Sequence, residues 1–224
     1  MSTAAIIPFL RELRDNNNRE WFVAKKEYAT GLQHEFLQYI QQIIDSIALF
    51  DSDLKGLDAK SCVFRLYRDI RFSPDKTPYK THFAAYMGAG GGRKSPRAGY
   101  YLHVEPDECF ISGGIYSPEK DILKAVRQAI FENMDEWEEI THAIEPYFPD
   151  RYGDTDKLKK VPQGFPSDGI GADWLKHKHY IFSHPLANSF YDNENTIPEL
   201  VALFQHSARL NRFINFTIDE LQNR

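Results

Sequence analysis

Hydrophobic residues recur at steps of three and four along the first fifty residues, and this spacing predicts helices. The segment IIPFLREL, residues 6–13, reads as a first helix, and the polar run at residues 15–18 supplies N-cap residues for the next one. From Arg19 to about Leu49 one apolar stripe predicts a long amphipathic helix, which Gly31 weakens in its middle. The stripe consists of Phe22, Tyr28, Leu32, Phe36, Tyr39, Ile40, Ile43 and Ile47.

From Ser61 the pattern changes to runs of aromatic and β-branched residues bounded by glycine and proline, which is typical of strands. The connections between these runs are short and contain no helix-length pattern, so we expect hairpins and an antiparallel sheet. The predicted strands are SCVFRLYRDIRF (61–72), THFAAYMGAG (81–90), AGYYLHVEP (98–106) and ECFISGGIY (108–116).

Helical spacing returns after Pro118, with Ser117 as the expected N-cap and the proline at the first helical position. The pattern then predicts an acidic helix at about residues 134–144, a further strand near residues 178–184 and a closing amphipathic helix at residues 197–221.

This order of elements predicts an α+β fold in a single domain over residues 1–224. A helical N-terminal part (3–50) and a helical C-terminal part (118–224) would flank the antiparallel sheet (about 61–116), with the strand near 178–184 added to it. We expect the helix from residue 19 and the helix after Pro118 to cover one face of the sheet, because their apolar stripes need a partner.

The composition is that of a folded protein, with 42% hydrophobic, 14% aromatic and 26% charged residues among 224. No run approaches the roughly 20 apolar residues of a membrane span, so we expect no membrane partner. Cys62 and Cys109 each lie in an apolar run and belong to no CxxC pair. We interpret them as reduced core thiols of a cytoplasmic protein.

The net charge of −5 conceals a strong asymmetry along the chain. Residues 60–97 hold nine Lys or Arg and two acids, a local net charge of +7, so the remainder carries −12. A phosphate group, a small carboxylate or a nucleic-acid backbone could use such an excess, and so could an internal network of ion pairs.

The excess is densest in FRLYRDIRFSPDKTPYKTHF, residues 64–83. In a strand with alternating faces, Arg68 falls among apolar residues, so it needs a carboxylate partner or a bulge that turns it outward. The turn at residues 73–78, stiffened by two prolines, could aim several cationic donors at one anion. The candidate ligand-binding residues are Arg65, Arg68, Asp69, Arg71, Asp75, Lys76, Tyr79, Lys80 and, from a later segment, Lys176.

The spacing Arg65-x-x-Arg68-Asp69-x-Arg71-Phe72, followed by Asp75-Lys76 and Tyr79, resembles the signature of a mainly bacterial family called domain of unknown function 2461. Further segments along most of the chain are similar to that family: NNREWF (17–22), GYYLHV (99–104), Gly113-Gly114, Val161-Pro162 with Gly164-Phe165, and LKHK (175–178). The resemblance implies no particular activity, cofactor or catalytic residue.

The functional prediction therefore rests on residue chemistry: a small phosphate- or carboxylate-bearing ligand bound at the cationic cluster. The alternative is a non-enzymatic module for protein or nucleic acid, in which the cluster is a structural ion-pair network. Nucleic acid is not favoured, because the acidic remainder would repel a long polyanion.

No motif for nucleophilic catalysis is found, and the sequence assigns neither an enzymatic activity nor a cofactor. A metal site is not predicted either. His177 and His179 have the alternate spacing of two ligands on a strand, and His82, His103 and His184 lie elsewhere, but no carboxylate is identified at ligand spacing.

Overall fold

The fold is an antiparallel sheet combined with long helices in a computed structural model that describes residues 4–152, 156–169, 171–193 and 195–222. The predicted α+β class is thereby confirmed. The helices are α1 (Ile6–Asp15), α2 (Arg19–Ala24), α3 (Lys26–Ile47), α4 (Ala59–Cys62), α5 (Lys120–Glu132), α6 (Met134–Ile144) and α7 (Thr196–Gln222), with short 3₁₀ turns η1 (Ser52–Leu54), η2 (Gly92–Lys94), η3 (Trp174–Lys176) and η4 (Asn188–Asp192). The strands are β1 (Phe83–Gly88), β2 (Gly99–Val104), β3 (Cys109–Ile115), β4 (Asp150–Tyr152) and β5 (Tyr180–Leu186).

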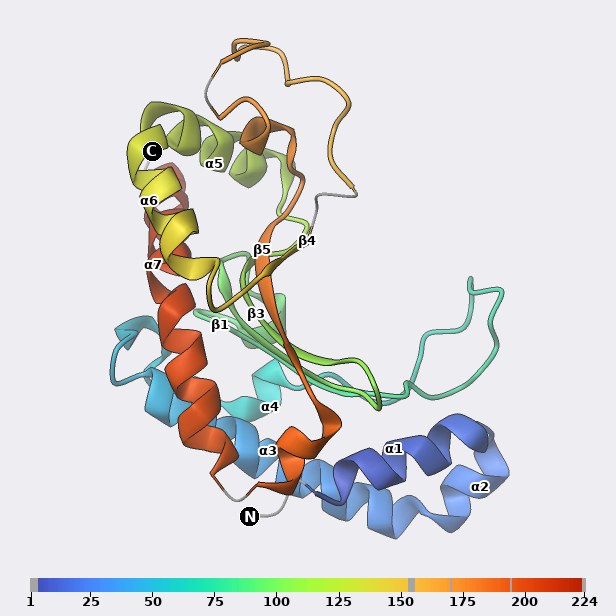
Figure 1. The fold of residues 1–224 in the computed structure, drawn as a ribbon. Coiled ribbons are helices and arrows are strands. Elements are labelled where there is room, and N and C mark those ends of the chain that lie inside the picture. The colour runs from blue at the N-terminus through green and yellow to red at the C-terminus, as the bar shows by residue number, and fades with distance from the viewer. Residues whose placement is uncertain (1–3, 153–155, 170, 194, 223–224) are drawn as a thin grey trace.

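The five strands lie in the order β1-β2-β3-β5-β4, and every neighbouring pair is antiparallel. The late strand β5 confirms the predicted addition near residues 178–184 and separates β3 from the short β4 (Figure 1). In the central pairs His103 of β2 lies opposite Ala84 of β1 and opposite Phe110 of β3.

One face of the sheet packs on helices α3 and α7. Phe36 of α3 contacts Phe83 of β1 with ring centroids 5.3 Å apart, and Phe204 of α7 contacts Tyr100 of β2 at 5.4 Å. The expectation that the helix after Pro118 covers the sheet is wrong, because α5 packs mainly against α7 and η3. The long C-terminal helix takes that place instead.

The opposite face carries polar side chains. Residues two apart on a strand share a face, so Tyr101 and His103 of β2 point away from α3 and α7, together with Ser112 of the neighbouring β3. The hydroxyl groups of Ser112 and Ser183 lie 2.7 Å apart on this face. Polar side chains on one face of a sheet can form a binding or catalytic site there.

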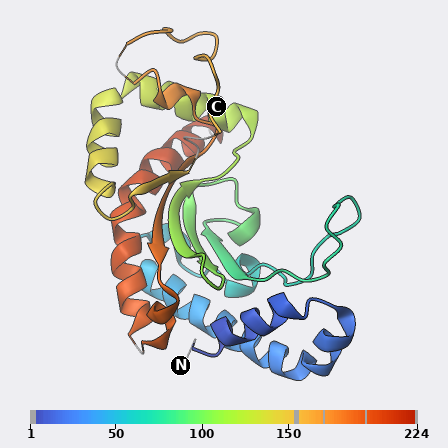
Figure 2. The same cartoon turned by 45° about the vertical axis from the view of Figure 1, so that its right-hand side comes forward.

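The prediction of a strand at residues 61–72 is wrong. Residues 59–62 form α4, Val63 makes a single bridge to Ala85, and the chain then leaves the sheet; β2 pairs with β1 and β3, and residues 61–72 do not pair with it. The physical reason is charge, because a strand here would place Arg68 on a covered apolar face. Residues 67–79 instead form a protruding arm, closed at its base by a bridge from Tyr67 to Tyr79 (Figure 2).

Two helix predictions also need correction. The long helix expected from Arg19 breaks at Lys25, whose ψ of 6° ends α2 and starts α3, and Tyr28 of the expected stripe is 50% exposed. Ser117 is not the N-cap of α5: its φ is 47°, its backbone N–H donates to His179 Nδ1, and Glu119 precedes the first helical residue.

Cys62 and Cys109 are buried free thiols, as expected. Within the described residues, no helix combines the length and apolarity that crossing a membrane requires. The single-domain organisation over residues 1–224 stays a prediction, and its outermost positions, residues 1–3 and 223–224, lie outside the described part of the chain.

Candidate functional site

Most of the predicted ligand-binding residues lie on the arm, and two of its arginines have carboxylates of their own. Arg71 donates two hydrogen bonds to Asp69, at 2.9 and 2.7 Å, and these bonds lower the pKa of Asp69 to about 2. Arg68 donates to Asp75 and to Thr77. The backbone N–H of Thr77, followed by Arg68, lowers the pKa of Asp75 to about 2. These charges are therefore compensated within the arm.

Two further predicted residues hold the arm in shape. Lys76 Nζ donates to the backbone oxygen of Ile70 at 3.0 Å. Tyr79 is 4% exposed, and its ring stacks on Phe22 with centroids 3.9 Å apart. The Asn17 side chain donates a hydrogen bond to the backbone oxygen of Tyr79 and accepts one from its backbone N–H. Burial raises the pKa of Tyr79. Tyr79 is an anchor of the arm rather than a side chain presented to solvent.

Lys176 lies apart from the arm, on η3 beside α5, and pairs with Asp173 at 3.5 Å (Figure 1). The structure therefore does not bring the nine predicted residues into one concave site. What remains uncompensated is the pair Arg65 and Lys80 at the foot of the arm. Neither side chain has a hydrogen bond or ion pair with another described residue, and burial together with the charge of Arg65 lowers the pKa of Lys80.

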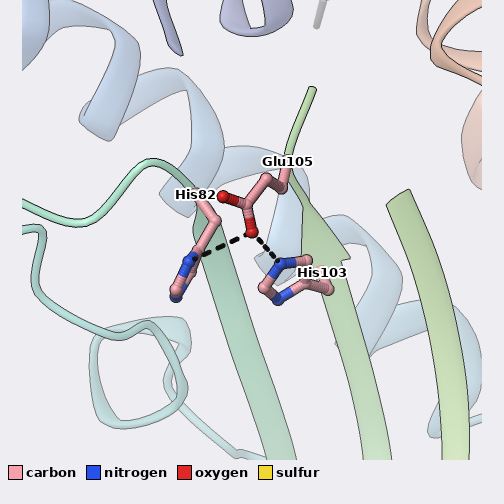
Figure 3. Close-up of side chains that lie close together, drawn as sticks. All are labelled: His82, His103 and Glu105. Carbon is pink, nitrogen blue, oxygen red and sulfur yellow. Dashed lines mark hydrogen bonds and ion pairs between the residues drawn. The ribbon is translucent and has the colours of Figure 1, made fainter. Parts of the chain in front are cut away.

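Next to the foot of the arm, three side chains converge: His82, which directly precedes β1, His103 of β2, and Glu105, which directly follows β2 (Figure 3). Glu105 Oε2 lies 2.9 Å from His103 Nε2 and 3.6 Å from His82 Nδ1. The ring centroids of the two histidines are 4.4 Å apart. We call these three residues the triad.

Burial and hydrogen bonds together shift the pKa values of His82 and Glu105. Burial lowers the pKa of His82 to about 4, with the charge of His103 acting in the same direction. Burial tends to raise the pKa of Glu105, but hydrogen bonds from Thr81 and His103 outweigh it and the net shift is downward. At neutral pH His82 is therefore a neutral imidazole beside a carboxylate, which are the forms that bind metal ions.

A second layer of contacts holds the triad side chains in place. The Tyr101 hydroxyl lies 2.9 Å from His103 Nδ1, and the ring of Phe110 stacks on His103 with a centroid distance of 4.8 Å. The Thr81 hydroxyl donates to Glu105 Oε1, which leaves Oε2 facing both imidazoles. Such outer contacts orient metal ligands in proteins.

The spacing of the triad fits one metal ion. Two ligand atoms at about 2.1 Å from an ion, at angles of 90–110°, lie about 3.0–3.4 Å apart. The distances from Glu105 Oε2 to His103 Nε2 and to His82 Nδ1, 2.9 and 3.6 Å, lie just below and just above this range. All three ligand atoms lie within 4.8 Å of one another. Two histidines and one carboxylate suit a divalent first-row transition metal and leave coordination positions open.

The sequence interpretation missed this site, although one signal was present. His103 and Glu105 have the alternate spacing of strand residues that share a face, so the statement that no carboxylate stands at ligand spacing is wrong. His82 directly precedes β1, and only the fold brings it to the other two residues. The alternative pair does not converge: His179 accepts from Ser117 N–H, and His177 Nδ1 lies 3.3 Å from the Trp174 backbone oxygen. Among the described residues the triad alone gathers three such ligands.

Comparison with known proteins gives a family and no close relative. A family model described as a conserved hypothetical protein (DUF2461) matches residues 5–213. No curated protein and no solved structure matches the chain. Because the match covers most of the 224 residues, the chain belongs to the DUF2461 family of conserved hypothetical proteins.

Proposed function

We propose that the protein binds one divalent transition-metal ion through His82, His103 and Glu105, and that this ion is the centre of its function. The observation that carries the proposal is the convergence of two imidazoles and a carboxylate within 4.8 Å on the polar face of the sheet. A bound ion would supply Lewis-acid chemistry at its open positions.

The geometry around His103 supports a cation at this point. His103 Nε2 and Glu105 Oε2 are 2.9 Å apart, so a proton or a metal ion must lie between two atoms that would otherwise repel. With a proton there, the Tyr101 hydroxyl donates to His103 Nδ1. With a metal there, Nδ1–H donates to the same hydroxyl oxygen, so Tyr101 serves both states.

Equilibrium dialysis of untagged protein against Zn²⁺, Co²⁺, Mn²⁺ and Fe²⁺, followed by elemental analysis, tests the proposal. We expect one ion per chain for the parent, and a loss of at least about 100-fold in affinity for Glu105→Gln and His103→Ala, because each removes a direct ligand. Because Glu105→Gln keeps the shape of the side chain, a loss of metal binding in this variant reports the lost carboxylate and not a folding defect. Exposed His142 on α6 provides the control His142→Ala, which should bind as the parent does. Equal binding by parent and triad variants would overturn the proposal.

We also propose that the protein is located in a reducing, cytoplasmic compartment. The support for this location is that the two cysteines are buried as free thiols.

A second candidate function is contact with a macromolecule through the arm. The observation in its favour is the tip: Phe72 is 94% exposed, and the Arg71 guanidinium lies 5.8 Å from the centre of its ring. An exposed aromatic beside a cation suits base stacking. Binding of a fluorescent single-stranded oligonucleotide that falls steeply with salt and is lost in Phe72→Ser would support this function. Binding that Phe72→Ser leaves unchanged would count against it.

A further inference from the structure

Two cations at the foot of the arm lack a carboxylate partner, in contrast to Arg68 and Arg71 farther along it. Among the described residues, neither the half-buried Lys80 nor the exposed Arg65 makes a side-chain hydrogen bond or ion pair. Asp69 is close enough for the charge of Arg65 to act on it, but its two oxygens accept hydrogen bonds from Arg71. Two like charges held together without an internal counter-ion leave room for an external anion.

A continuous path of contacts joins Lys80 to the triad. Lys80 Nζ lies 5.2 Å from the ring centre of Phe64. The Phe64 ring in turn packs edge-on against Tyr101 with centroids 6.4 Å apart, and the Tyr101 hydroxyl lies 2.9 Å from His103 Nδ1.

The backbone strengthens this placement. Phe64 N–H donates to the Ala84 oxygen of β1, and Lys80 N–H donates to the Leu66 oxygen, so both segments are fixed beside the start of β1. Lys80 is two residues before His82, and its charge acts on that histidine. Lys80 therefore lies at the edge of the proposed metal site, and Arg65 is close enough for its charge to act on Lys80.

We infer that Arg65 and Lys80 form an oxyanion subsite of the triad, which binds the phosphate group of a small ligand so that one of its oxygens reaches the metal ion. The inference rests on the proposed function, since it needs the metal. A divalent ion with one carboxylate ligand leaves a charge of +1, and the two cations raise the local charge to +3. A phosphate dianion suits this charge, and the guanidinium of Arg65 can donate two hydrogen bonds to it.

This subsite contains only some of the cationic residues that the sequence predicts to bind an anionic ligand. Arg68 and Arg71 are bonded to Asp75 and Asp69, so binding an anion there would require breaking an existing ion pair. Lys76 provides a matched control: Lys76→Gln removes one positive charge from the same basic segment and frees no carboxylate, because Lys76 Nζ donates to the backbone oxygen of Ile70.

The experiment uses the full chain loaded with Co²⁺, whose visible absorption reports both the metal and changes in its ligands. Inorganic phosphate is titrated at fixed ionic strength into the parent, Arg65→Gln, Lys80→Met and Lys76→Gln proteins. Methionine keeps an apolar stem over Phe64. We expect phosphate to alter the parent spectrum, with a loss of about 10-fold or more in phosphate affinity for Arg65→Gln and for Lys80→Met. Lys76→Gln should match the parent, and all variants should keep their Co²⁺ affinity within about threefold.

The outcomes separate this inference from the proposed function. If the parent binds no Co²⁺ at the triad, the proposed function fails and the inference fails with it. If Co²⁺ binds but Arg65→Gln and Lys80→Met take up phosphate as the parent does, the inference alone is overturned. An equal loss in Lys76→Gln, or equal displacement of phosphate by chloride, would show general attraction to a basic segment and would also overturn it.

Discussion

Tyr79 offers the clearest distinction between a ligand-binding residue and a structural anchor. Its ring is 4% exposed and stacks on Phe22 at 3.9 Å, with Tyr67 at 5.2 Å on the arm itself. Truncating a buried aromatic typically costs 3–5 kcal/mol, and aromatic contacts contribute to that figure. Because this ring lies at the base of an arm that can partly collapse, we expect Tyr79→Ala to lower the free energy of unfolding by about 3 kcal/mol.

Urea denaturation and thermal unfolding measure this effect. For a chain of this length a loss of about 3 kcal/mol corresponds to about 6–12 °C in melting temperature. The control Tyr79→Phe keeps the ring and should stay within about 0.5 kcal/mol of the parent. A loss below about 1 kcal/mol for Tyr79→Ala, or an equal loss for Tyr79→Phe, would refute the anchor role.

Three further predictions concern ion pairs and buried polar contacts. Arg71→Met should change the melting temperature by less than about 2 °C, because the side chain is 76% exposed and its pair with a carboxylate is screened; a large loss in thermal unfolding would contradict this. Asn215→Leu should cost about 2–4 kcal/mol in urea denaturation, since Asn215 binds both the N–H and the oxygen of Ala98, at 2.8 and 3.1 Å, and both would be left unpaired; an unchanged midpoint would contradict it. A hydrogen bond from Arg97 lowers the pKa of Asp219, so the stability it contributes is present above about pH 4 and is lost as pH falls through the lowered pKa. The parent should therefore exceed Asp219→Asn in unfolding free energy at pH 7 by more than at pH 2.5, and a constant difference would refute the assignment.

The helices and the hairpins of the sheet could be predicted because local pattern decides them. The acidic helix expected at residues 134–144 is α6, and the closing helix is α7 within one residue at each end. In such segments the apolar stripe, the caps and the burial agree with one another. The strands at β1, β2 and β3 follow from the same consistency.

The error at residues 61–72 has a tertiary cause. Alternation of apolar and cationic residues resembles a half-buried strand, but of the apolar residues Phe64, Leu66, Ile70 and Phe72 only Leu66 is buried, whereas Phe72 is 94% exposed. The energy of burying Arg68 is not visible in a period-two pattern. The arm with its internal ion pairs avoids that burial.

The cationic cluster could be found from the sequence, but which of its cations pair with a carboxylate could not. Spacing alone gives no reason why Arg71 meets Asp69 while Arg65 stays without a carboxylate. The triad was less accessible still, because His82 reaches Glu105 across 23 positions of the chain, through the pairing of β1 with β2. A pair of ligands on one strand could be predicted, and the third ligand required the fold.

Anomalous X-ray scattering from crystals grown with Zn²⁺ tests the central claim most directly. The account predicts one strong peak per chain on the polar face of the sheet, about 2.0–2.2 Å from the ring nitrogens of His82 and His103 and from a carboxylate oxygen of Glu105. Data collected on both sides of the zinc absorption edge would identify the ion. Zinc peaks confined to surface residues such as His142, with His103 Nε2 still hydrogen-bonded to Glu105, would contradict the claim and leave the triad as a structural cluster.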